Sequence, residues 1–145
     1  MTPEDVPDRP LVVDTDVASF AFLGKGRAER FKPLLDGHVL CLSFATVGEL
    51  WTMAEHAKAK WGERRRADLE AFIRRFVVLP VDAEVTAWYA RIHAAVSGQV
   101  DQNDEWTAAC ALAQNEALPV VTNNVKHFER IAGSFGDLIV VHPDK

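Results

Sequence analysis

Short apolar runs alternate with longer amphipathic segments along the chain. The runs are rich in β-branched residues, as is typical of strands buried on both faces of a parallel sheet. They predict strands at residues 11–13, 38–42, 77–79, 119–122 and 138–141. The segments between them predict helices at residues 17–23, 27–35, 44–60, 63–76, 83–96, 104–116 and 127–131. Strands that alternate with helices predict an α/β domain with a mainly parallel central sheet covered on both faces.

The chain has 145 residues, enough for one domain that buries roughly two-thirds of its unfolded surface. We predict this domain at residues 11–145, after a flexible, acidic and proline-rich arm at residues 1–10. The formal net charge of −5 excludes a basic protein that coats nucleic acid. Any binding of phosphate would therefore need a local basic patch or bound cations.

Cysteine usage and hydropathy bear on the compartment. Cys41 and Cys110 lie in apolar segments and are expected to be core thiols of a reduced protein. The amino terminus lacks the apolar core of a signal peptide. No apolar run approaches the ~20 residues that span a bilayer. We therefore expect a cytoplasmic protein without membrane attachment.

The first predicted strand runs directly into two acids, in the order Asp14-Thr15-Asp16. Acids just past the carboxyl end of a buried strand stand where open α/β sheets bind ligands. On an extended chain the two carboxylates would point the same way and would need a cation or a proton between them. Alternatively, Asp14 and Asp16 form a turn and cap the following helix.

Further oxygen-bearing side chains follow other strands. Glu49 lies on the helix after the second strand, Asp104 lies at a helix start, and Thr122-Asn123-Asn124 ends the fourth strand. Each acid has a structural alternative, since Glu49 could complete a capping box with Thr46 and Asp104 could interact with a helix dipole. Gathered at one sheet edge, oxygen ligands suit Mg²⁺ or Mn²⁺. Such an ion can activate water and stabilise a leaving alkoxide, as phosphodiester hydrolysis requires.

Four motifs in order resemble the PIN domain, and more narrowly the VapC-type toxin ribonucleases of bacterial toxin–antitoxin pairs. They are Val-Val-Asp14-Thr15-Asp16, Ser43-x-x-Thr46-x-x-Glu49-Leu50, Asn103-Asp104-x-x-x-Ala108-Ala109 and Val121-Thr122-Asn123-Asn124-x-x-x-Phe128. The resemblance spans residues 11–141. It implies a three-layer α/β/α domain whose acidic pocket binds Mg²⁺ or Mn²⁺ and hydrolyses RNA.

The resemblance also implies roles for single residues. The catalytic and metal-binding acids of the family fall on Asp14, Glu49 and Asp104. Further metal ligands would be Asp16 and Asn124, and further pocket-lining residues would be Thr15, Thr122 and Asn123.

Two positions depart from the family pattern. Position 16 is commonly Asn in these toxins, and here it is Asp. The fourth acid of many PIN domains falls near Asn124, which carries no charge and so weakens the case for a tightly bound second ion. Asp101 is a further acid close by, and it is expected to be a solvated loop residue.

A basic cluster lies at a predicted helix–helix junction: Lys58, Lys60, Arg64, Arg65 and Arg66. It is either a solvated face or a track for the RNA backbone. Nearby, Trp51 and Trp61 are expected in the core, or in the groove that receives the antitoxin in the resembled toxins. That family commonly dimerises. The resemblance therefore implies an RNA substrate, an antitoxin and a second copy of the chain as partners.

The histidines are scattered without metal-ligand spacing at positions 38, 56, 93, 127 and 142. Each is expected to pack in the fold or lie on the surface rather than bind a metal.

Two alternative functions remain open at this point. A phosphatase of the haloacid-dehalogenase type would use Asp14 as nucleophile and Asp16 as acid/base, although Asp101 and Asp104 introduce a helix where that fold needs acids after a strand. A PIN-like binding domain with weak catalysis is the second alternative, which the neutral Asn124 keeps open.

Overall fold

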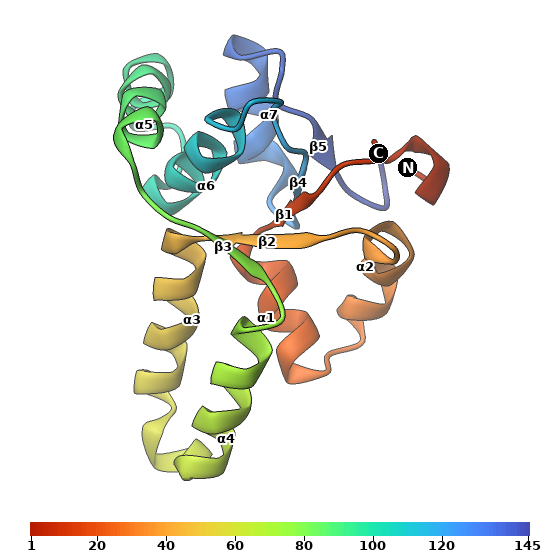
Figure 1. Cartoon of the computed structure of the whole chain (residues 1–145), viewed down its shortest axis with the longest axis vertical. Coiled ribbons are helices and arrows are strands. Elements are labelled where there is room, and N and C mark those ends of the chain that lie inside the picture. Colours follow the sequence, from red (N-terminus) through yellow and green to blue (C-terminus); the bar gives the residue numbers. More distant parts are fainter.

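A five-stranded sheet lies at the centre of the molecule, and all its neighbouring strands are parallel (Figure 1). The computed structural model describes all 145 residues. The strand order is β3-β2-β1-β4-β5. The strands are β1 (Leu11–Val13), β2 (Leu40–Ser43), β3 (Val77–Leu79), β4 (Val120–Val121) and β5 (Val140–Val141). The predicted parallel α/β sheet is confirmed.

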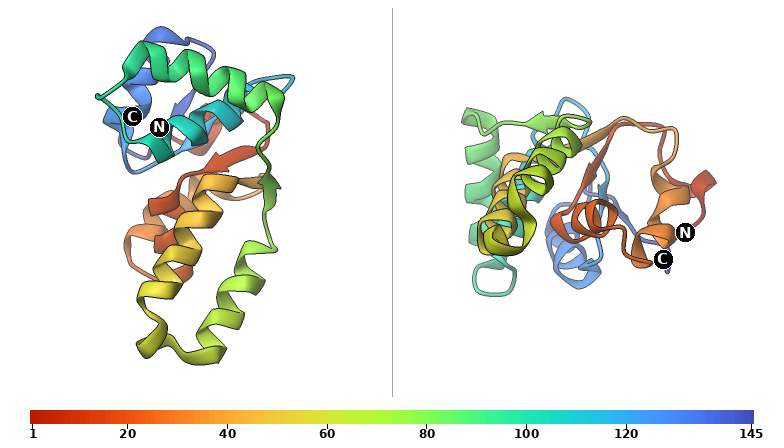
Figure 2. Two further views of the ribbon diagram at one scale, coloured as in Figure 1. Left: turned by 90° about the vertical axis from the view of Figure 1, so that its left-hand side faces the viewer. Right: turned by 90° about the horizontal axis from the view of Figure 1, so that it is seen from below.

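Helices cover both faces of the sheet, as predicted (Figures 1 and 2). One layer consists of α1 (Thr15–Leu23), α2 (Arg27–Leu35), α3 (Phe44–His56) and α4 (Lys58–Ile73). The other layer consists of α5 (Ala83–Val96), α6 (Gln102–Leu112) and α7 (Val125–Ser134). Figure 2 shows α3 and α4 as a hairpin that extends away from the sheet. None of the helices combines the length and the apolar character that a membrane crossing requires.

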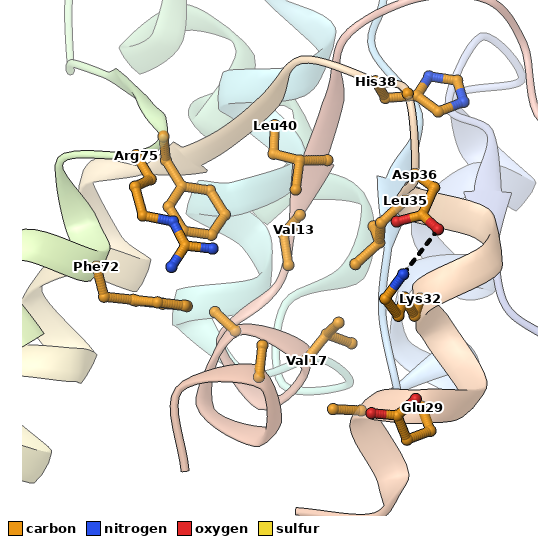
Figure 3. A pocket seen from close by; sticks show the side chains of 15 residues that line it. Val13, Val17, Glu29, Lys32, Leu35, Asp36, His38, Leu40, Phe72 and Arg75 are labelled. Atoms are coloured by element: carbon orange, nitrogen blue, oxygen red, sulfur yellow. Dashed lines mark hydrogen bonds and ion pairs between the residues drawn. The ribbon is translucent and has the colours of Figure 1, made fainter. Parts of the chain in front are cut away.

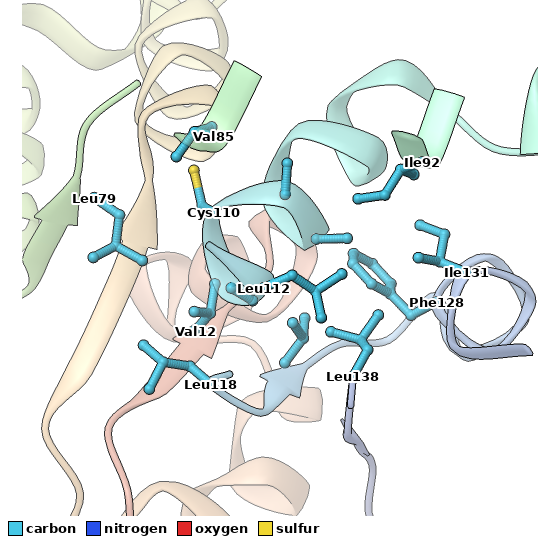
Figure 4. Packing of buried hydrophobic residues seen from close by; sticks show 14 of the residues in the cluster. Val12, Leu79, Val85, Ile92, Cys110, Leu112, Leu118, Phe128, Ile131 and Leu138 are labelled. Carbon is cyan, nitrogen blue, oxygen red and sulfur yellow. The ribbon is translucent and has the colours of Figure 1, made fainter. Parts of the chain in front are cut away.

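Alternation of side chains along the strands divides the core between the two layers. Leu11 and Val13 of β1 pack with the layer of α1–α4, whereas Val12 packs with the layer of α5–α7. Figure 4 shows the second cluster, in which Phe128 and Ile131 of α7 meet side chains from the sheet and from α5 and α6. The sheet therefore has a core on each face, whereas Val77 and Val78 of its edge strand β3 are exposed.

The strand order positions a candidate site. The chain runs outward from β1 to β2 and β3, and then returns to the other side of β1 with β4 and β5. Val13 and Val121, the last residues of β1 and β4, are aligned in register. Ligands of open α/β sheets bind beside the carboxyl ends of strands where the order reverses in this way.

Several element boundaries differ from the predictions because side-chain caps decide them. α1 begins at Thr15 rather than residue 17, since Asp14 caps it. α6 begins at Gln102 because Asp101 is its N-cap; Asp101 is exposed, as expected, and its carboxylate accepts from the backbone N–H of Asn103. The helix predicted at residues 44–60 ends at His56, and a second break follows at Gly62 inside α4.

The first ten residues contact the carboxyl-terminal part of the chain. They include a short 3-10 helix, Pro3–Asp5, followed by Val6, which is buried. The terminal amine donates to the carbonyl of Pro143 at 3.2 Å, and the Arg9 guanidinium donates to the carbonyl of Ala117 at 2.9 Å. The flexibility expected of this arm stays a prediction.

Both cysteines are buried in one core cluster as free thiols. Burial raises the pKa of the Cys41 thiol, and it raises that of Cys110 to about 12. Both are core residues, as expected from the apolar segments in which they lie.

Substitution of Gly62, at the break inside α4, tests whether its backbone conformation requires glycine. Gly62 has φ 63° and ψ −177°, a conformation that is essentially restricted to glycine. We expect Gly62→Ala to lower the free energy of unfolding by about 1–3 kcal/mol, measured by urea denaturation. The control is Gly48→Ala inside α3, where an added Cβ meets no atom within 4 Å. It should raise stability by about 0.5–1 kcal/mol, and effects of equal sign would contradict the assignment.

Candidate active site

Acidic side chains gather at the carboxyl edge of the sheet, where β1 and β4 end. Asp14 follows β1 directly, Glu49 projects from α3, and Asp104 projects from the first turn of α6. Asp14 is 4% exposed and Asp104 is 7% exposed. Three distant segments thus bring carboxylates to one buried edge.

Asp14 is held by two hydrogen bonds. One carboxylate oxygen, Oδ1, accepts from the backbone N–H of Thr15 at 2.8 Å and caps α1. The other, Oδ2, accepts from the hydroxyl of Thr122 at 2.9 Å. The capping alternative for Asp14 is therefore confirmed, and it is compatible with a place in a site because the cap fixes the carboxylate at the end of β1.

Glu49 is bound to the same strand end through Thr15. The Thr15 hydroxyl donates to Glu49 Oε1 at 2.7 Å and lies 3.1 Å from the hydroxyl of Thr46. Ser43 caps α3 by accepting from the N–H of Thr46 at 3.1 Å. The capping-box alternative for Glu49 is therefore wrong: this glutamate lies beyond the first turn and faces Thr15.

Asp104 is held by α7. Its Oδ2 accepts from the Asn124 side-chain amide at 2.9 Å and lies 2.7 Å from Nδ1 of His127. The Asn124 backbone N–H donates to the Thr122 hydroxyl at 2.8 Å. Hydrogen bonds therefore run without interruption from Asp14 through Thr122 and Asn124 to Asp104.

His127 was not predicted as a site residue. Its Nδ1 must carry the proton if it is to donate to the carboxylate of Asp104. The signal in the sequence was the spacing Asn124-x-x-His127 at the start of a helix after a strand, which places both side chains on one helix face. A lone histidine in that position gives no indication of its distant partner.

Burial and like charge dominate the electrostatics of the pair. Burial, followed by the charge of Asp104, raises the pKa of Asp14 to about 7, against the lowering effect of its hydrogen bonds from Thr122 and Thr15. Burial also raises the pKa of Asp104, which the bond from His127 opposes. Near neutral pH, the pair therefore retains a proton or requires a cation.

The donor set fits a hard cation, although it is not a ready-made cage. No three His, Cys, Asp or Glu side chains converge on one point. Thr15 connects two of the acids, because its backbone N–H donates to Asp14 and its hydroxyl donates to Glu49. Carboxylate and hydroxyl oxygens are nonetheless the donors that Mg²⁺ and Mn²⁺ prefer, and a cation would offset the repulsion between Asp14 and Asp104.

The architecture and this arrangement of acids agree with a known family. Residues 11–134 match the family model of the PIN domain. The chain belongs to the PIN domain family. The resemblance predicted from the four motifs is therefore confirmed, and a PIN domain that occupies most of the chain does not favour the phosphatase alternative.

Relatives of this PIN domain carry nuclease names. It is 32% identical over 126 residues to the tRNA(fMet)-specific endonuclease VapC of Shigella flexneri, which covers 85% of this chain and 92% of that protein. It is 36% identical over 95 residues to ribonuclease VapC2 of Haemophilus influenzae, covering 63% of this chain and 69% of that protein.

Solved structures also resemble this chain. DNA-bound VapBC from Salmonella typhimurium matches with a TM-score of 0.73 and 31% identity, over 92% of this chain and 97% of that chain. VapBC2 from Rickettsia felis, bound to a promoter DNA fragment, matches with a TM-score of 0.71 over 91% of this chain and 97% of that chain. At 23% identity, the second match concerns the fold alone. The predicted three-layer fold is confirmed.

Two predicted site residues lie outside the hydrogen-bonded network of this PIN domain. Asp16 is exposed in the first turn of α1, so the extended geometry expected for residues 14–16 is wrong: the helix has already begun at Thr15. Its charge still contributes to the raised pKa of Asp14. Asn123 is exposed and binds none of the acids.

The basic cluster divides into two groups. Arg65 lies 4.6 Å from the ring centroid of Phe22, and Arg66 forms an ion pair with Glu55 at 3.0 Å, so both serve the packing of α4. The remaining members are exposed: Lys58, Lys60 and Arg64. Lys60 also lines a hollow of about 530 Å³ together with Glu49 and His56. This hollow extends from Glu49 toward Lys60 of the basic cluster.

The raised pKa of Asp14 predicts how stability depends on pH. The folded protein retains this proton up to about pH 7, whereas the unfolded chain releases it near pH 3.8, so stability falls as pH rises through that window. The loss is at most about 4 kcal/mol at 1.36 kcal/mol per unit. In chelator, thermal unfolding should show a Tm that decreases from pH 5 to pH 8.

Asp14→Asn should be more stable than the wild type at pH 8 and should flatten this pH dependence. Asp137→Asn, which removes an exposed acid outside the network, should leave the slope unchanged. An Asp14→Asn protein that retains the wild-type slope would show that another group is responsible.

Proposed function

We propose that this PIN domain is a divalent-metal-dependent endoribonuclease that acts as the toxin of a toxin–antitoxin pair. The observation that carries the proposal is the buried pair Asp14 and Asp104 at the β1–β4 edge, linked by hydroxyls and an amide to each other and to Glu49. Membership of the family and relatives named as VapC ribonucleases support the choice of RNA as substrate.

The residues to hold Mg²⁺ or Mn²⁺ are Asp14 and Asp104, with Glu49 at the side of Thr15. When bound, such an ion supplies an activated water and stabilises the charge that develops on the leaving oxygen. Both hydrogen bonds to Asp104 go to Oδ2, and the bond to Glu49 goes to Oε1. Oδ1 of Asp104 and Oε2 of Glu49 are therefore left available in the pocket.

The surrounding side chains orient these acids. Thr122 fixes Asp14, and Asn124 with His127 fixes Asp104. Because Asn124 is neutral, it supplies hydrogen bonds where a fourth acid would add repulsion. The pocket therefore holds one closely spaced pair of acids, and Asp16 adds its negative charge from the edge of the pocket.

Cleavage of RNA tests the proposed chemistry. Purified wild-type protein should cleave RNA in Mg²⁺ and lose this activity in chelator. Asp104→Asn should reduce the rate about 100-fold or more, since removal of one charge that stabilises the transition state costs on the order of 3 kcal/mol. The rate is measured on a fluorescently labelled RNA, with Asp137→Asn as the control for loss of an exposed acid. Wild-type protein without RNA cleavage would favour the catalytically weak binding domain.

We further propose an antitoxin protein as partner, in a homodimer of this chain in the cytoplasm. Structural neighbours from Salmonella typhimurium and Rickettsia felis are VapBC complexes. An apolar groove of about 450 Å³ lies beside α1, α2 and the end of α4 (Figure 3). Val13, Val17 and Phe72 line it, and Lys32 and Asp36 form an ion pair at its rim. Such a groove suits a partner segment with apolar side chains flanked by charges.

Filling the groove should separate binding of the antitoxin from catalysis. Ala28 lines the groove from α2, and Ala28→Trp should occupy it and weaken binding about tenfold or more, as expected for a lost central contact. The measurement is co-purification and titration with any small protein whose gene adjoins the gene of this chain, together with RNA cleavage, which should persist. Ala87→Trp on the exposed face of α5 is the control. Unchanged binding by Ala28→Trp would place the partner elsewhere.

A further inference from the structure

We propose that a cationic hollow on α7 binds a backbone phosphate of the substrate, next to the phosphate that would be cleaved at the acidic site. This inference rests on the proposed ribonuclease function and deepens it. The hollow has a volume of about 330 Å³, and its lining consists of Gln99, Lys126, His127 and Arg130. We call it the α7 hollow. No apolar residue lines it.

The α7 hollow adjoins the acidic site through one side chain. His127 lines the hollow, and its Nδ1 lies 2.7 Å from Oδ2 of Asp104. The same imidazole therefore separates the acid from the basic residues. A strand of RNA with one phosphate at Asp104 would have a neighbouring phosphate beside α7.

The two cations of the hollow are not neutralised by acids. Neither Lys126 nor Arg130 takes part in an ion pair, whereas the nearby Glu129 is already paired with Lys145. Arg130 instead donates to Oε1 of Gln99 at 2.5 Å, which holds the guanidinium at the hollow. A planar guanidinium and an ammonium group are the donors that bind phosphate best.

The chemistry of the lining selects the backbone rather than a base. Bases bind on aromatic or apolar faces, and the hollow offers none. The chain carries a net charge of −5 and its catalytic edge is acidic, so a polyanion needs local positive charge to approach Asp104. Lys126 and Arg130 supply two such charges. They should thus contribute affinity without sequence preference.

Binding of RNA without catalysis tests this assignment. The variant is Lys126→Ala with Arg130→Ala, and the matched control is Lys25→Ala with Arg27→Ala, which removes the same charge near the junction of α1 and α2. Fluorescence anisotropy with a labelled single-stranded RNA of mixed sequence is measured in chelator at several salt concentrations. The slope of the logarithm of the association constant against the logarithm of the salt concentration should become shallower by about 0.7 for the variant, which loses one phosphate contact, and should stay unchanged for the control.

Kinetics in Mg²⁺ give a second readout. The double variant should raise KM about tenfold and leave kcat within about twofold, because the hollow binds substrate and transition state equally. Thermal unfolding by circular dichroism checks that both double variants are folded. Equal salt slopes and equal KM for the variant and the control would overturn the inference. So would a loss of antitoxin binding with unchanged RNA binding, which would assign the hollow to an acidic protein segment.

The phosphate-binding inference and the proposed ribonuclease function can fail independently. If the wild-type protein cleaves no RNA, the ribonuclease proposal fails, while the anisotropy measurements still decide whether the α7 hollow binds a phosphate backbone. If the wild-type protein cleaves RNA and the double variant behaves as the control does, the ribonuclease proposal stands and the inference fails.

Discussion

The repulsion between two buried carboxylates, Asp14 and Asp104, is the constraint on which the rest of the site depends. Burial raises the pKa of both carboxyl groups, and the charge of Asp104 raises that of Asp14 further. The fold offsets part of this cost with donors from the Thr122 hydroxyl, the Asn124 amide and the His127 imidazole. The part of this cost that the donors do not offset gives the pair an affinity for a proton or a cation. That residual affinity is the property a metal-dependent nuclease would use.

The order of the strands explains why the acids meet at all. β1 lies in the middle of the sheet, so its carboxyl end faces the starts of α3 and α6 from both layers as well as the end of β4. The same order separates the surfaces available to macromolecules. The apolar groove lies in the layer of α1–α4, whereas the α7 hollow lies in the opposite layer. A protein partner and an RNA strand can therefore bind to opposite layers of one small domain.

The sequence was sufficient to predict the fold and to single out acids that the structure places at the β1–β4 edge, because both depend on local patterns. Apolar runs such as Leu11–Val13 predict buried strands, and an acid after such a run predicts a sheet-edge site. The partners of the acids could not be predicted in this way. The bond from Thr15 to Glu49 joins residues from two elements, and the contact of His127 with Asp104 depends on how α7 packs against α6. Helix starts differed for a related reason, since single caps at Asp14 and Asp101 set them.

The hydroxyl of Thr122 has a single hydrogen and can donate only one hydrogen bond. It accepts from the backbone of Asn124, so its own hydrogen is committed to Asp14. An isosteric valine would fill the same space, yet it would leave Oδ2 of the buried Asp14 carboxylate and the backbone N–H of Asn124 without these partners at once. Serine would preserve both bonds. Position 122 therefore requires a hydroxyl group, because an apolar residue of equal volume would match its shape and lose both hydrogen bonds.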